Sequence, residues 1–276
     1  MEELGVTKRN LPKVMIVTGG AAGIGAAIVK LAIEQGHKVA IADVDIAAAR
    51  QLAASLGESA LPLDLDICSE ARWKAAVEAT CRHFGRLDVL VNNAGVAHPG
   101  PTRDVPLEAH EHTLRVNALG PMLGSLAVLP HFRAQGSGHI ATVCSMTAFL
   151  TLPGLVSYAA SKHALRAMHL GLALEERGSP VDFTIIHPGA TETAMLEMEA
   201  EKGVTAAFSR EPAAPEEIAA IVLKAIRDKK TEVCIPAARG RVVKAIGANP
   251  RRLFELVEKN ERIGATMLAS RRARSK

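Results

Sequence analysis

The chain has 276 residues and a mass of 29.2 kDa, the size of one large domain or two small ones. Because hydrophobic residues make up 48% of it and charged residues 22%, disorder is excluded for most of the chain. The four cysteines are scattered and form no C-x-x-C pair, which argues against a zinc site and against a disulfide framework. We therefore expect no bound metal and a reducing compartment.

Charge is unevenly distributed along the chain. From Arg239 to Lys276 there are 11 Lys or Arg and 3 Asp or Glu, whereas the whole chain has a formal net charge of only +4. This predicts a mildly acidic body with a basic tail. The acidic start has no apolar segment after it, unlike a secretory signal. The uncharged stretch 140–161 is too rich in Ser, Thr, Pro and Gly for a membrane span, so we expect a cytoplasmic protein.

Short apolar runs alternate with longer helical patterns. Seven runs read as β-strands, at residues 14–17, 39–42, 61–65, 89–91, 140–143, 183–186 and 233–235, and helical patterns between them include 26–34, 70–83, 107–129 and 157–176. Such alternation predicts βαβ units with right-handed crossovers, and hence a doubly wound parallel sheet of the Rossmann type in an α/β fold. No linker divides the chain, so we expect one domain over residues 1–248 and a basic, helical C-terminal extension over 249–276.

The first strand ends in a glycine-rich turn, Thr18-Gly19-Gly20-Ala21-Ala22-Gly23-Ile24-Gly25, and a helical pattern follows at once. Glycines let the chain turn tightly and let its backbone approach a pyrophosphate, while the helix N-terminus supplies N–H donors. A tight turn that only packs a helix onto a strand would show the same glycine-rich sequence. The strand before it and the helix after it favour a dinucleotide site.

Asp43 ends the second strand, 18 residues after Gly25. A carboxylate at that place can accept hydrogen bonds from an adenosine ribose and would repel a 2′-phosphate. No Arg or Lys occupies residues 19–25 or 43–49 to bind such a phosphate. NAD is therefore favoured over NADP as the cofactor, although Asp43 could also be a helix cap or a turn residue.

Four more patterns follow in a fixed order. They are Asn92-Asn93-Ala94-Gly95, then Ser145, then Tyr158-Ala159-Ala160-Ser161-Lys162, and finally Pro188-Gly189. With a glycine turn spaced as T-G-x-x-x-G-x-G, this ordered set resembles the short-chain dehydrogenase/reductase family. The matches run from Thr18 to Thr193. The resemblance implies an oxidoreductase that interconverts an alcohol and a ketone or aldehyde by hydride transfer.

Tyr158 and Lys162 lie four residues apart, so on a helix they share a face. A free Tyr has a pKa near 10, and a nearby ammonium would lower it toward neutrality. Tyr158 could then take a proton from an alcohol, or donate one to a carbonyl in the reverse direction. Ser145, 13 residues before Tyr158, could hydrogen-bond the substrate oxygen. Alone, these residues could equally be a half-buried Tyr, a surface Lys and a turn-forming Ser.

The resemblance also assigns roles to further residues. It implies a catalytic set of Asn117, Ser145, Tyr158 and Lys162. It implies a cofactor-binding set of Thr18, Gly19, Gly23, Ile24, Gly25, Asp43, Asp64, Asn93, Ala94, Gly95, Tyr158, Lys162, Pro188, Gly189, Thr191 and Thr193. In the family, the counterpart of Asn117 kinks a long helix and holds a water beside the Lys, and that of Asp64 lies beside the adenine ring. A satisfied polar residue in a helix and a solvated Asp are the alternatives for these two.

The expected substrate is a small hydrophobic alcohol or ketone, such as a steroid, a retinoid or an acyl chain. In the family the segment after Pro188-Gly189 covers the substrate, and here residues 194–208 are rich in apolar and flexible side chains. The same residues could instead pack a helix onto the domain. The helices expected at 107–129 and 157–176 resemble those that pair subunits in the family, so a homodimer or homotetramer is expected.

The basic tail allows three interpretations. It could dock on the domain or on a partner subunit, make peripheral contact with an anionic membrane through an apolar stripe, or be a solvated end. Nucleic-acid binding is not expected, because basic and aromatic residues do not interleave. For the chain as a whole, the alternative to an enzyme is a non-catalytic dinucleotide-binding sensor or scaffold on the same fold. Retention of both Tyr158 and Lys162 favours the enzyme.

Overall fold

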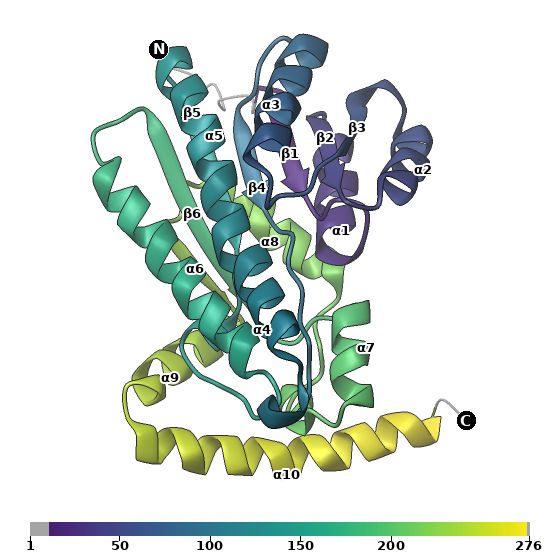
Figure 1. Cartoon of the computed structure of the whole chain (residues 1–276), viewed down its shortest axis with the longest axis vertical. Helices are drawn as coiled ribbons and strands as arrows, with labels where there is room; N and C mark the ends of the chain where they lie inside the picture. Colours follow the sequence, from purple (N-terminus) through teal and green to yellow (C-terminus); the bar gives the residue numbers. More distant parts are fainter. Residues whose placement is uncertain (1–10, 275–276) are drawn as a thin grey trace, which may run out of the picture.

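The computed structural model describes residues 11–274, and a parallel seven-stranded sheet forms its centre (Figure 1). The strand order is β3-β2-β1-β4-β5-β6-β7. The strands are β1 (Val14–Thr18), β2 (Lys38–Asp43), β3 (Ala60–Asp64), β4 (Val89–Asn92), β5 (Gly138–Val143), β6 (Val181–Pro188) and β7 (Glu232–Ile235). All seven expected strands are confirmed. They read as continuous apolar runs because helices cover both faces of the sheet.

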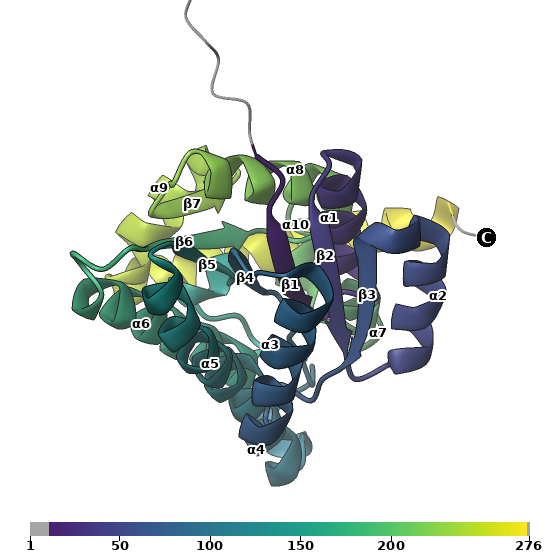
Figure 2. The same ribbon diagram turned by 90° about the horizontal axis from the view of Figure 1, so that it is seen from above.

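Helices cover the sheet on both sides (Figure 2). They are α1 (Gly23–Glu34), α2 (Ile46–Leu56), α3 (Glu70–Phe84), α4 (Leu107–Leu114), α5 (Gly120–Gln135), α6 (Val156–Glu175), α7 (Ala194–Glu201), α8 (Pro215–Arg227), α9 (Ala237–Gly247) and α10 (Pro250–Arg274). Helices α1, α2 and α8 pack on one face, and α3, α5 and α6 on the other. This is the doubly wound architecture expected from the sequence.

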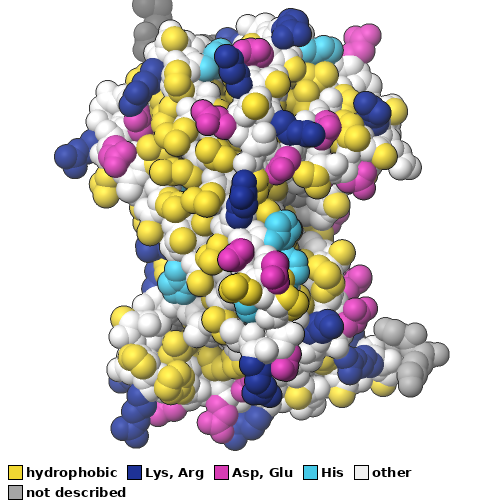
Figure 3. All heavy atoms as spheres, in the orientation of Figure 1, with side chains coloured by type: hydrophobic (Ala, Val, Ile, Leu, Met, Phe, Trp, Pro, Cys, Tyr) yellow, Lys and Arg dark blue, Asp and Glu magenta, His cyan; other side chains and the backbone are white. Residues whose placement is uncertain are grey.

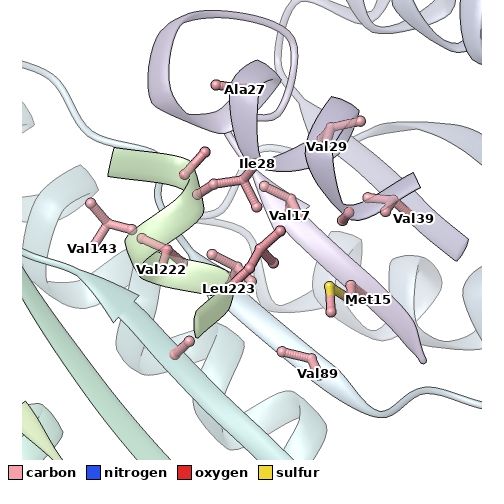
Figure 4. Close-up of a cluster of buried hydrophobic side chains, with 14 of the residues drawn as sticks. Met15, Val17, Ala27, Ile28, Val29, Val39, Val89, Val143, Val222 and Leu223 are labelled. Atoms are coloured by element: carbon pink, nitrogen blue, oxygen red, sulfur yellow. The ribbon is translucent and has the colours of Figure 1, made fainter. Parts of the chain in front are cut away.

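The two faces of β1 show how the core is divided. Met15 and Val17 point toward α1 and α8 (Figure 4), whereas Ile16 between them points toward α3 and α5. This follows from the two-residue repeat of a strand. Because β1 is buried on both faces, its carboxyl end is held rigidly, and the glycine-rich turn follows directly from it.

The helical pattern expected over residues 107–129 is confirmed, and a π-helical turn interrupts the helix around Asn117, where the resemblance implied a kink. Helix α4 ends at Leu114, a π-helical turn covers Arg115–Leu119, and α5 then continues past Pro130 to Gln135. A proline causes the interruption, because Pro121 has no N–H to donate to the carbonyl four residues earlier, that of Asn117.

The C-terminal helix α10 docks on the domain itself, which confirms one of the three interpretations of the basic tail. Val257 and Leu268 are buried, and a Cβ added at Gly264 would lie 1.8 Å from the backbone oxygen of Thr205. Helix α10 thus lies against the 3₁₀ turn η5 (Thr205–Phe208) and near α7 (Figure 1). Within residues 11–274, no helix is both long and apolar enough to cross a membrane.

Candidate active site

Two cavities meet at the carboxyl edge of the sheet. The larger, here the glycine-loop cleft, has a volume of about 580 Å³ and lies at the point where the strand order reverses between β1 and β4. The smaller, here the α7 pocket, has a volume of about 150 Å³ and lies beneath α7. Tyr158 lines both cavities, so a molecule bound in one cavity and a molecule bound in the other can come into contact beside this side chain.

The glycine-rich turn is built for close approach of its backbone. Gly19 has a φ of +60°, and a Cβ added there would lie 2.9 Å from the Cα of Ala94. A Cβ at Gly25 would lie 2.0 Å from the backbone oxygen of Gly19. Helix α1 begins at Gly23 with no side-chain cap, so its first N–H groups stay available to an anion in the cleft.

Hydrogen bonds of Thr18 and Asn93 fix the backbone that forms the wall of the cleft. The Thr18 hydroxyl accepts hydrogen bonds from the backbone N–H groups of Asn93, at 2.9 Å, and Ala94, at 3.1 Å. In return, Asn93 Nδ2 donates to the backbone oxygens of Thr18, at 3.0 Å, and Gly19, at 3.3 Å. These bonds join the ends of β1 and β4 and leave Ala94 and Gly95 on the cleft wall.

Asp43 lies on the cleft wall with its carboxylate fixed by the backbone. One oxygen accepts from the N–H of Ala21 in the glycine turn, and the other from the N–H of Asp45, both at 3.0 Å. Each oxygen keeps a free lone pair, so the carboxylate remains an acceptor for a bound hydroxyl group.

Asp64 does not lie in the cleft. Its carboxylate forms an ion pair with Arg72 at 2.6 Å, and its side chain is about half exposed. Asp66 lines the cleft instead, beyond the end of β3, where the chain turns toward α3. The structure therefore places Asp66, and not Asp64, on the cleft wall.

Lys162 is a buried cation that faces the cleft. It is 3% exposed, and its Nζ makes only a long contact of 3.5 Å to the backbone oxygen of Val143. Burial lowers its pKa. A Cβ added at Gly95 would lie 3.5 Å from the same Nζ, so the backbone of the cleft wall passes directly over this ammonium.

The expected lowering of the Tyr158 pKa is wrong for the protein alone. Lys162 Nζ lies 5.5 Å from the centre of the Tyr158 ring, but burial of the phenol raises its pKa. The charge of Glu199 raises it further, and a hydrogen bond with Ser145 opposes both effects. Tyr158 is thus a neutral phenol at physiological pH, the form that donates a proton.

Asn117 lies in the π-helical turn with its side chain fully engaged. Its Oδ1 accepts from the N–H of Val96, and its Nδ2 donates to the carbonyl of Val96, both at 2.8 Å. Nδ2 also donates to the hydroxyl of Ser161, at 3.0 Å. The side chain therefore joins the segment after Gly95 to α6, which holds Lys162 in place against the cleft.

His187, in β6, contacts the backbone of Ser145. Its Nδ1 lies 3.0 Å from the backbone oxygen of Ser145, and its Nε2 lies 3.1 Å from Oε1 of Glu232. Burial opposes ionisation of Glu232, but hydrogen bonds from Lys244 and Arg166 outweigh it and lower the pKa to about 2. Sequence patterns missed this network because Glu232 lies on the edge strand β7, far along the chain.

The segment after β6 separates the two cavities. Thr193 lines both of them and caps α7, with its hydroxyl accepting from the N–H of Leu196 at 3.4 Å. Pro188, Gly189 and Thr191 line only the α7 pocket. Ile24, from the glycine turn, closes the junction between the cavities.

These residues fit a bound dinucleotide. The cleft offers the uncapped N-terminus of α1 for a pyrophosphate. The Asp43 carboxylate lies at one end, where it can accept hydrogen bonds from ribose hydroxyls, and the Lys162 ammonium lies at the other end, where it can donate them. Among the described residues, this ammonium has only the long contact to Val143 and is almost completely buried, which costs free energy unless a ligand supplies acceptors.

Comparison with known proteins supports the same interpretation. The family model described as short chain dehydrogenase matches residues 13–203. A 3-beta-hydroxysteroid dehydrogenase of Comamonas testosteroni is 36% identical over 202 residues, which are 72% of this chain and 79% of that protein. A 3-alpha-(or 20-beta)-hydroxysteroid dehydrogenase of Mycobacterium bovis is 33% identical over 223 residues, 81% of this chain and 85% of that protein.

A solved structure agrees. The 3-ketoacyl-(acyl-carrier-protein) reductase of Brucella melitensis, complexed with NADH, superimposes with a TM-score of 0.74 at 30% identity, covering 80% of this chain and 95% of that one. Sequence match, sheet order and cleft geometry agree. The chain belongs to the short-chain dehydrogenase/reductase family and is an oxidoreductase acting on CH–OH groups.

Proposed function

We propose that the protein is an NAD(H)-dependent dehydrogenase of hydrophobic secondary alcohols, with a hydroxysteroid as the best candidate substrate. The observation that carries the proposal is the position of Tyr158, which lines both the glycine-loop cleft and the α7 pocket. A nicotinamide in the cleft and an alcohol in the pocket would meet there. The two hydroxysteroid dehydrogenases among its relatives support the substrate class.

Asp43 supports NAD over NADP. Its carboxylate is fixed at the cleft wall and would lie against a 2′-phosphate, whereas it can accept hydrogen bonds from free ribose hydroxyls. The relative solved with NADH is consistent with this choice.

The chemistry can be assigned to residues of this chain. The bound nicotinamide ring supplies or accepts the hydride. In reduction, the Tyr158 phenol donates a proton to the substrate carbonyl, and the Ser145 hydroxyl hydrogen-bonds the same oxygen as its charge develops. In oxidation, the Tyr158 phenol must first lose its own proton to solvent, and the resulting phenolate then accepts the proton of the alcohol. The Lys162 ammonium would face the ribose hydroxyls of a bound cofactor, and it would stabilise the phenolate in both directions.

Helices α5 and α6 are the proposed subunit interface. Apolar side chains gather on the face that these helices form (Figure 3), and Leu119, Leu126 and Leu174 are 52%, 49% and 63% exposed. Such a patch is unusual on a monomer and fits a homodimer or homotetramer. Helix α10 turns Val257 and Leu268 inward against the domain, whereas its Phe254 and Ile263 are 70% and 39% exposed, so membrane contact through these exposed residues stays a prediction.

The test is a pair of measurements on the purified protein. NADH and NADPH are titrated by fluorescence, and oxidation of a 3-hydroxysteroid is followed through NADH absorbance. We expect tighter binding of NADH and steroid-dependent formation of NADH. Equal or tighter binding of NADPH would overturn the cofactor assignment. Cofactor binding without any hydride transfer would favour the non-catalytic sensor.

A further inference from the structure

The α7 pocket contains one carboxylate that the reaction scheme does not use. Most of its lining is apolar, with Leu150, Leu152 and Met195 among the side chains. Glu199 also lines this pocket, and the residue is only 7% exposed. Leu196, one turn earlier on α7, is buried too, so these two residues form the inner face of the helix.

Glu199 has no protein partner in the described part of the chain. No residue within 11–274 donates a hydrogen bond to its carboxylate or forms an ion pair with it, and burial alone raises its pKa, to about 7. Arg239 lines the same pocket, but neither charge affects the other's pKa, so the two are not paired. The other acidic residues of α7, Glu197 and Glu201, point to solvent.

The carboxylate is close to the reaction centre. Its charge is the largest influence on the pKa of Tyr158 after burial itself. A substrate whose reacting oxygen contacts Tyr158 therefore lies beside Glu199 as well. Buried polar groups in proteins are almost always hydrogen-bonded, and an unpartnered one facing a binding pocket indicates a partner on the ligand.

We propose that Glu199 binds the substrate by accepting a hydrogen bond from a second hydroxyl group, so that the preferred substrate is a diol or a hydroxyketone rather than a simple alcohol. This inference rests on the proposed function, because it requires Tyr158 to act on an alcohol in the α7 pocket. It narrows the substrate class from hydrophobic alcohols in general to those that carry a second hydrogen-bond donor close to the hydroxyl group that reacts.

The test compares alcohols that differ by one hydroxyl group. Cyclohexanol is paired with the cyclohexane-1,2-diols and cyclohexane-1,3-diols, each oxidised with NAD by the wild type and by Glu199→Leu. We expect the wild type to prefer at least one diol about 10- to 100-fold in kcat/KM, the selectivity that a hydrogen bond to a charged group supplies. In Glu199→Leu this ratio should fall close to one.

Two further variants separate the hydrogen bond from other effects. Glu199→Gln keeps an acceptor oxygen without the charge and should retain part of the diol preference. Glu197→Gln removes an exposed carboxylate from the same helix and should leave the preference unchanged. Folding of each variant is checked by circular dichroism and NADH titration.

A binding measurement keeps the test independent of turnover. In the presence of NADH, a diol should raise the Tm of the wild type more than its matched mono-alcohol does, and this difference should vanish in Glu199→Leu. A diol preference that survives in Glu199→Leu, or a wild type indifferent to the second hydroxyl in both assays, would overturn the assignment. Absence of hydride transfer from every alcohol would contradict the proposed function instead.

Discussion

Replacing Glu199 by Gln is expected to stabilise the fold, by an amount that grows as the pH rises from 4.5 to about 7. In the folded chain the pKa of Glu199 is raised from 4.5 to about 7 by burial. Below pH 4.5 the carboxyl is protonated in both the folded and the unfolded chain, so its burial has no ionic cost. As the pH rises from 4.5 through 7, the unfolded chain loses this proton first, and the folded state loses stability.

The magnitude follows from the same two values. Each tenfold difference in proton affinity between the two states is worth about 1.36 kcal/mol, so the ionised carboxylate costs the fold about 3 kcal/mol above pH 7. Gln has nearly the same shape and no charge. Glu199→Gln should therefore be more stable than the wild type by up to about 3 kcal/mol at pH 9, an advantage that changes little down to about pH 7 and then shrinks toward pH 5.

Urea unfolding can measure this, because Trp73 is the single tryptophan and is fully buried, so its fluorescence reports unfolding. Wild type and variant are compared at equal protomer concentration from pH 5 to pH 9. Glu197→Gln, on the exposed face of the same helix, is the control and should show no such trend. A difference between Glu199→Gln and wild type that does not change with pH would refute the reasoning.

Three other substitutions test the site and the surface. Tyr158→Phe should reduce kcat by at least about 100-fold, the lower range for loss of a general acid, while the Kd for NADH stays within a factor of about three; retained turnover would contradict the assigned proton donor. Asp43→Ala should weaken NADH binding about tenfold and narrow its advantage over NADPH in parallel titrations. An unchanged preference would show that another residue sets it. Leu126→Glu should shift the protein to smaller oligomers in light scattering; an unaltered mass would place the interface elsewhere.

The sheet and the position of the cofactor cleft could be predicted from sequence because their signals are local. A parallel strand buried on both faces reads as a continuous apolar run, and the glycine turn directly follows β1. Tyr158 and Lys162 were paired correctly because a helix repeat places residues four apart on one face. The roles of the catalytic and cofactor-binding residues remain predictions.

Other features depend on contacts between distant segments, which spacing does not encode. Asp64 and Asp66 are both acidic and close to the end of β3, and only the folded turn shows which one faces the cleft. The composition of the tail allowed three interpretations, and the fit of Gly264 against the backbone of Thr205 shows that the tail docks on the domain. Glu199 could not be told from Glu197 without knowing which face of α7 is buried.

The docking of α10 has a consequence for the nascent chain on the ribosome. The last residue that lines the glycine-loop cleft is Met195, so the segments that form that cleft emerge early in synthesis. The α7 pocket includes Ala206 and Arg239, and η5 is held by Gly264 of α10, which emerges among the last residues. We therefore expect all the residues that line the cleft to be present in the growing chain before those that complete and support the alcohol pocket.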